Sequence, residues 1–114
     1  MEAILVDSAV SKQRLKDIAQ EQFGELVKAV VDIRKGVMAI GGELHSDEEA
    51  FLLESGSSQQ DLWGINLYPD LELPEMLEFD SMINIRPSQK NRSRGVEDSA
   101  VRDEILRVVA KLVH

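Results

Sequence analysis

The segment 84–98, NIRPSQKNRSRGVED, concentrates the residues of this sequence that are best suited to bind an anion. Its basic side chains are Arg86, Lys90, Arg92 and Arg94, and no acidic residue lies among them. Guanidinium groups are forked donors that match the oxygen atoms of phosphate and carboxylate. We therefore predict that Arg86, Arg92 and Arg94 gather around one small negatively charged ligand.

Neutral polar residues of the same segment supply further donors to such a ligand. Ser88, Gln89 and Asn91 carry hydroxyl and amide groups, and Gly95 permits backbone angles that other residues avoid. Backbone N–H groups at the start of the helix that follows also favour anions. The spacing matches neither a Walker motif nor a G-x-G-x-x-G fingerprint, so it predicts an oxyanion site without specifying the ligand.

Two predicted strands position this segment, one over residues 61–70 and one over residues 76–87. Strand alternation places Trp63 and the apolar residues in phase with it on one face of the sheet. The opposite face then receives Asn66, Asp80, Asn84 and Arg86. Asn and Asp are depleted from strands, so these positions indicate a ligand-facing surface, or else strand ends, bulges or a homodimer contact.

The rest of the chain alternates strands with helices. Residues 3–7 predict a strand, and a helix begins after Ser11 and stops at Gly24. A β-hairpin turns at residues 34–36, and the glycine pair 41–42 near its end indicates a bulge or a close backbone approach.

Two more helices are predicted from their end signals. Ser46 and Glu49 match a capping box for a helix that Gly56 terminates. A C-terminal amphipathic helix begins at Asp98 or Ser99.

This order is strand, helix, strand, strand, helix, strand, strand, helix, and it predicts an α+β fold as a single domain over residues 1–114. We expect a mainly antiparallel sheet of four to five strands with helices packed on one face.

Composition narrows the classes of function. The chain has 114 residues, a net charge of −8 and no cysteine, which excludes disulfides and cysteine-ligated metals. It has neither a signal peptide nor a membrane-length apolar run, so we expect a cytoplasmic protein.

Residues 36–85 contain eleven acidic and no basic residues. Duplex DNA is therefore an improbable partner, whereas a short single-stranded RNA stays open.

The leading hypothesis is binding of a small anionic ligand, such as a nucleotide or a phosphorylated metabolite. The three arginines supply the charge, and the polar side chains orient the ligand: Asn66, Asn84, Ser88, Gln89 and Asn91. One alternative is that the basic residues pair with acidic neighbours inside the protein. Another is a non-catalytic interaction module, in which the basic loop of one copy meets the acidic 36–85 region of a second copy.

The sequence leaves open whether the protein is an enzyme, and it indicates no cofactor. Asp80 is the only candidate base, and it needs burial or a ligand nearby, because a free Asp titrates at about 3.9. The GELHSDEE string suggests Mn, Fe or Zn binding through Glu43, His45, Asp47 and Glu48, completed by Asp80 or Asp32. Helix capping explains that string equally well, so we predict no metal site.

Two strings resemble a known family. LWGINLYP and FDSMINIRPSQKNRSRGVED, with MAIGGELHSDEE before them, are similar to a family of small prokaryotic proteins that is catalogued as a domain of unknown function. The resemblance spans the chain from Lys12 onward. It implies a single domain and supplies no activity, cofactor or catalytic residue.

Overall fold

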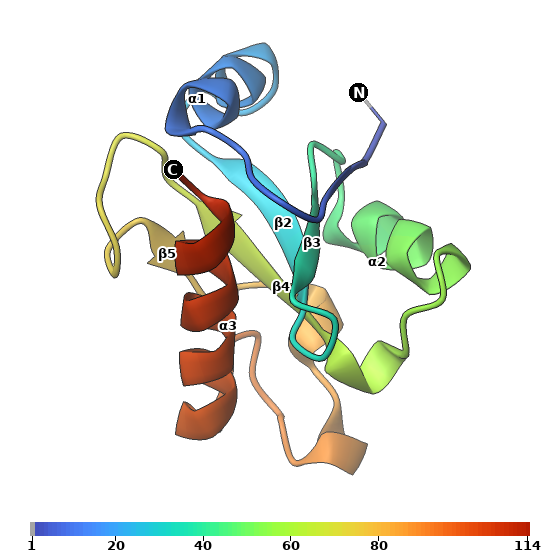
Figure 1. Ribbon diagram of the computed structural model, residues 1–114. Coiled ribbons are helices and arrows are strands. Elements are labelled where there is room, and N and C mark those ends of the chain that lie inside the picture. The colour runs from blue at the N-terminus through green and yellow to red at the C-terminus, as the bar shows by residue number, and fades with distance from the viewer. Residues whose placement is uncertain (1) are drawn as a thin grey trace.

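The computed structural model describes residues 2–114, which form a five-stranded sheet and three helices (Figure 1). The strands are β1 (Ile4–Val6), β2 (Val27–Asp32), β3 (Val37–Ile40), β4 (Leu62–Leu67) and β5 (Leu77–Glu78). The helices are α1 (Lys12–Glu21), α2 (His45–Glu54) and α3 (Ser99–Leu112). None of the helices in this described range has the length and apolar character needed to cross a bilayer. The predicted α+β class is confirmed.

All pairings between named strands are antiparallel, in the order β1-β3-β2-β4-β5. The predicted hairpin joins β2 to β3, and its turn contains Gly36 at φ +70°, a backbone angle that favours glycine. Lys28 of β2 lies opposite Asn66 of β4, which in turn lies opposite Glu78 of β5. These three polar residues therefore form one row across the sheet.

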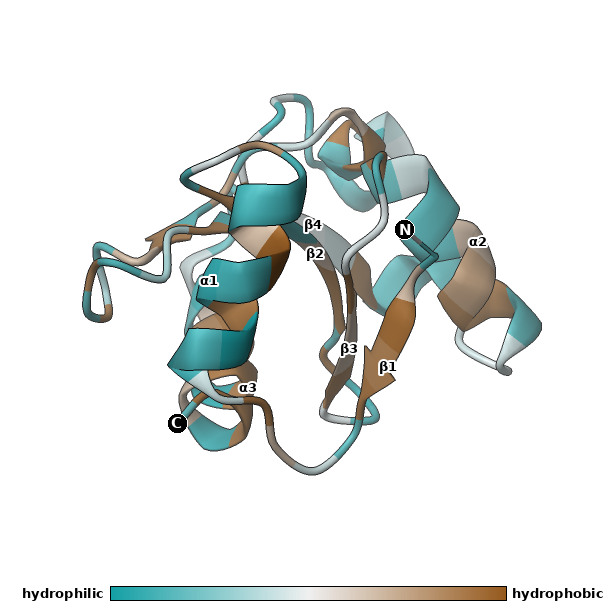
Figure 2. Cartoon of the chain, turned by 90° about the horizontal axis from the view of Figure 1, so that it is seen from above, coloured by the Kyte–Doolittle hydropathy of each residue, from teal (hydrophilic) through white to brown (hydrophobic). Residues whose placement is uncertain are grey.

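Helices cover both faces of the sheet, which corrects the prediction that they cover one (Figure 2). Helices α1 and α3 pack on the face that carries Val31, Ile65 and the larger hydrophobic core. Helix α2 packs on the other face, where Leu52 joins a smaller core with Val30, Ala39 and Leu62. The predicted polar face is thus largely buried, and Lys28 and Asn66 form a polar row at one end of it.

Two of the three predicted helix N-caps are confirmed. The Ser11 hydroxyl accepts from the backbone N–H of Arg14 at 3.0 Å, and Asp98 caps α3 by accepting from Ala100 at 2.8 Å. The capping box predicted at Ser46 is wrong, because the observed cap is Leu44, two residues earlier, and it has no side-chain acceptor. The first turn of α2 therefore lacks a side-chain cap for its N–H groups.

The predicted strand over residues 76–87 is confirmed only at its start and is wrong beyond Glu78. Strand β5 ends at Glu78, and two 3₁₀ turns follow, Met82–Asn84 and Pro87–Gln89. Ser81 starts the first turn, since its hydroxyl accepts from the N–H of Ile83 at 3.3 Å. Serine and asparagine side chains compete with strand pairing by making such local bonds, and the alternation therefore fails here.

Gly64 lets this turn pack directly against β4. A Cβ atom at Gly64 would lie 2.5 Å from the Cβ of Ser81 and 3.1 Å from a side-chain carbon of Ile83. Glycine is therefore required at this strand position for the close approach of the 81–84 turn.

We predict that Gly64→Ala lowers the free energy of unfolding by about 2 kcal/mol, because the added methyl group overpacks a buried contact. Chemical denaturation measures the change. Gly95→Ala is the matched control, since a Cβ there meets its nearest atom at an ordinary 3.5 Å. Equal stability of the two variants would contradict the proposed packing.

Candidate anion-binding pocket

Arg86, the first of the three predicted anion ligands, is a buried structural residue. Its guanidinium donates to the backbone carbonyls of Ile83 (3.1 Å), Gln59 (2.6 Å) and Leu62, and its carbon lies 4.3 Å from the centre of the Trp63 ring. Only 9% of the residue is exposed. The donors of Arg86 are thus occupied by the protein itself, and the prediction that it binds a ligand is corrected.

Asn84 and Asn91 are likewise occupied by backbone groups. The Asn84 amide accepts from the N–H of Gly64 at 2.8 Å and donates to the carbonyls of Gly64 and Arg94, both at 2.9 Å. Asn91 donates to the carbonyls of Asn84 (2.7 Å) and Gly95 (2.8 Å). Both side chains hold the loop in place, so they do not orient a ligand as we predicted.

The remaining predicted residues of the loop separate from one another. Arg94 pairs with Asp80 at 2.7 Å, whereas Arg92 is exposed. Gln89 accepts from Arg86 at 3.0 Å, and Ser88 is exposed. The three guanidinium groups therefore do not surround one ligand, because Arg86 is buried against β4 and Arg94 forms an ion pair with Asp80.

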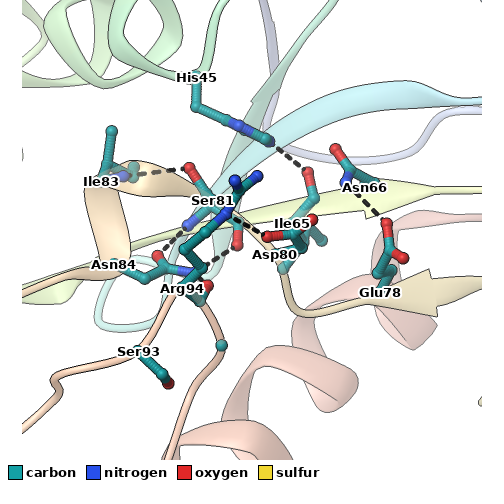
Figure 3. Close-up of polar contacts among 12 residues, drawn as sticks. His45, Ile65, Asn66, Glu78, Asp80, Ser81, Ile83, Asn84, Ser93 and Arg94 are labelled. Carbon is teal, nitrogen blue, oxygen red and sulfur yellow. Dashed lines mark hydrogen bonds and ion pairs between the residues drawn. The ribbon is translucent and has the colours of Figure 1, made fainter.

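A pocket of about 380 Å³ does form where Arg94 meets the polar row of the sheet (Figure 3). It lies between the first turn of α2, the ends of β2 and β4, and the loop that carries Asp80. Its polar lining residues are Lys28, His45, Ser46, Asn66, Asp80, Ser81 and Arg94. The pocket thus joins Asn66, Asp80 and Arg94 of the sequence prediction with residues from other elements.

Asn66 forms part of the floor of this pocket and is 8% exposed. Its Nδ2 group donates to Glu78 Oε1 at 2.8 Å, and this bond fixes the orientation of the amide. The other end of the amide, Oδ1, is buried and has no partner among the described residues. Figure 3 shows this oxygen on the side of the amide away from Glu78.

His45 is the first residue of α2 and covers the pocket from above. Its Nε2 atom lies 2.7 Å from the carbonyl oxygen of Ile65, which can only accept, so Nε2 carries the proton. Burial lowers the pKa of His45, and nearby Lys28 and Arg94 lower it further, against the Ile65 carbonyl and Asp80, which raise it. The imidazole is therefore neutral at pH 7, with its lone pair on Nδ1.

The positive charge of the pocket comes from Lys28 and Arg94. Among the described residues Lys28 forms no ion pair, and its ammonium lies 5.1 Å from the centre of the Phe23 ring. Arg94 is partly neutralised by Asp80 in a half-exposed pair. The uncapped first turn of α2 adds a favourable dipole for an anion.

Comparison with protein families matches residues 4–112 to the family described as "Protein of unknown function (DUF5674)". The chain belongs to this family. No curated protein and no solved structure matches it. The family match confirms the resemblance seen in the sequence, and the DUF5674 description assigns no activity to these residues.

Glu48 is a buried carboxyl group of this DUF5674 chain that the sequence did not single out as such. It is fully buried, and its Oε2 accepts from the N–H of Gly42 at 3.0 Å. Burial raises the pKa of Glu48 to about 9, so the group is protonated at pH 7. The close approach predicted at the glycine pair is confirmed, because a Cβ on Gly42 would lie 2.7 Å from Glu48 Cγ.

The metal hypothesis drawn from GELHSDEE finds no geometric support in the described residues. They contain no group of three His, Cys, Asp or Glu side chains that could hold an ion. Glu48 faces the sheet, whereas Glu43 and Asp47 are exposed. Asp32 is engaged in the hairpin turn, where it accepts from the backbone of Arg34 and Lys35 at 2.9 Å.

We predict that Glu48→Gln removes part of the pH dependence of stability. Native Glu48 keeps its proton up to a pKa of about 9, whereas the unfolded chain releases it above about 4.5. Its contribution to stability is therefore complete below about pH 4.5 and is lost as the pH rises toward 9. Between pH 5 and pH 8.5, the free energy of urea unfolding of the variant should rise relative to that of the wild type by more than about 1 kcal/mol.

The control for this comparison is Glu54→Gln, an exposed position at the end of α2. It should follow the wild-type pH profile throughout. The titration of His45 is common to all three proteins, so it cancels in the differences. A Glu48→Gln profile parallel to that of the wild type would contradict the assignment of a buried, protonated carboxyl group.

Proposed function

We propose that this protein binds a small anionic ligand in the pocket lined by Lys28, His45, Asn66 and Arg94. The observation that carries the proposal is the ammonium of Lys28, which forms no ion pair with any residue in the range 2–114, in a pocket that also contains the uncapped start of α2. A charged donor and a helix N-terminus on one pocket favour a phosphate or carboxylate group. This site keeps the anionic ligand of the sequence hypothesis and moves it from the arginine-rich loop to the sheet.

The rim of the pocket suits the carbon skeleton of such a ligand. Phe23, Leu44 and Met82 line it and are 45%, 54% and 65% exposed, respectively. Large apolar side chains at the mouth of a polar pocket lose water-exposed area when a ligand covers them. The geometry therefore favours a small organic anion over a bare inorganic one.

The interaction module has less support from the same geometry. It requires free basic side chains on the loop. Arg86 is buried and Arg94 is paired with Asp80, so on this loop only Lys90 and Arg92 are exposed without an ion pair among the described residues. Asp80, the candidate base, is the counter-ion of Arg94, so the pocket supports binding more strongly than catalysis by this carboxylate.

We predict that n-propyl phosphate binds the wild-type protein and that Lys28→Met weakens binding at least about tenfold. A hydrogen bond from a charged group contributes about 1.5–3 kcal/mol, which corresponds to that loss. Isothermal titration calorimetry at low salt measures the affinity.

Lys111→Met is the matched control, because it removes the same charge from an exposed position on α3. It should leave the affinity within about twofold of the wild type. Equal losses in the two variants would mean that only net charge matters and would contradict the pocket. If neither n-propyl phosphate nor glycerol 1-phosphate bound the wild-type protein, the proposal would be overturned outright.

A further inference from the structure

We infer that the ligand of this pocket is a hydroxylated anion, whose hydroxyl group donates a hydrogen bond to Asn66 Oδ1. This inference rests on the proposed function and specifies the class of ligand. It follows from Asn66 Oδ1, a buried atom of a pocket-lining residue that finds no partner among residues 2–114.

The orientation of the Asn66 amide decides what it can recognise. Its Nδ2 group faces Glu78, and Tyr68 also donates to that carboxylate, at 3.1 Å. A flipped amide would place Oδ1 against the Glu78 oxygen, and two acceptors would then face each other. The Glu78 carboxylate therefore holds an acceptor, not a donor, in position for the ligand.

A buried acceptor without a partner costs about 1–3 kcal/mol, and a ligand that supplies a donor recovers part of that cost. An anionic head group has no donor to offer when it is fully ionised. The ligand must therefore carry its donor on a second group, close to the anion.

A hydroxyl group fits this requirement better than an ammonium group. Lys28 lies directly opposite Asn66 across the sheet, and its positive charge opposes a second cation at the same place. Asp80 is the carboxylate of the pocket lining, and Arg94 already neutralises it. His45 adds a neutral imidazole, which also favours a neutral donor.

The arrangement thus divides the ligand into three parts. The anionic group faces Lys28 and the first turn of α2, the hydroxyl group faces Asn66, and the carbon chain lies against the apolar rim. Since Oδ1 is itself buried, a small shift of the lining side chains accompanies binding.

Two phosphate monoesters of equal carbon length test the inference. Glycerol 1-phosphate carries two hydroxyl groups, and n-propyl phosphate carries none. Calorimetry on the wild-type protein should show glycerol 1-phosphate binding at least about fivefold more tightly, which is the contribution of one good hydrogen bond. Asn66→Leu should abolish this preference, so that the two esters bind the variant with affinities within about twofold of each other.

Tyr68→Phe is the matched control, because it removes a bond to Glu78 and leaves the Asn66 amide in place. It should keep the preference for glycerol 1-phosphate. If Asn66→Leu does not fold, as judged by circular dichroism, Asn66→Ala takes its place with the same expectation, because alanine also has no side-chain acceptor.

The outcomes separate the two proposals. Equal affinity of the two esters for the wild-type protein would overturn the hydroxyl inference and leave anion binding standing. A preference that persists in the Asn66 variant would also overturn it. Failure of both esters to bind would refute the proposed function, and the inference would fall with it.

Discussion

The structure depends on a set of buried hydrogen bonds, made by asparagine side chains, that hold the segment 81–97 against β4. The Asn84 side chain satisfies both backbone groups of Gly64, as a neighbouring strand would, at a point where β5 has already ended. Asn91 then holds the carbonyls of Asn84 and Gly95. A buried polar group without a hydrogen-bond partner costs free energy of folding. Each of these amides therefore helps the backbone groups around it to remain buried.

This attachment also shapes the pocket. The amide of Asn84 donates to the carbonyl of Arg94, and the N–H of Ser81 donates to the same carbonyl at 2.9 Å. Arg94 and Asp80 are thereby held facing the start of α2. Asn84 and Asn91 thus act on the site through the backbone and do not line the pocket, whereas Arg94 lines it directly.

Much of the fold was predictable because its signals are local. The caps at Ser11 and Asp98, the β2–β3 hairpin and the close approach at Gly42 follow from residues near one another in the chain. The strand over 76–87 was not predictable by alternation, since local bonds of Ser81 and the fit to Gly64 override it. Glycine within β4 was the one signal of that fit.

The candidate site was predictable only in part. Asn66, Asp80 and Arg94 were chosen for their chemistry, and they do line one pocket. Lys28 was not chosen, and His45 was considered only as a metal ligand. Their proximity depends on α2 covering the second face of the sheet, a tertiary feature that no local pattern encodes. Arg86 was predicted to contact a ligand, yet it is buried, and its guanidinium donates to the carbonyls of Gln59 and Leu62, which are distant in sequence.

The most direct test of this account is a map of amide chemical shifts in the ¹⁵N-labelled protein during titration with glycerol 1-phosphate. The account predicts that the largest shifts cluster at Lys28, Asn66, Arg94 and residues 44–46, which surround the pocket. Shifts confined to residues 88–93, on the exposed part of the arginine-rich loop, would contradict it.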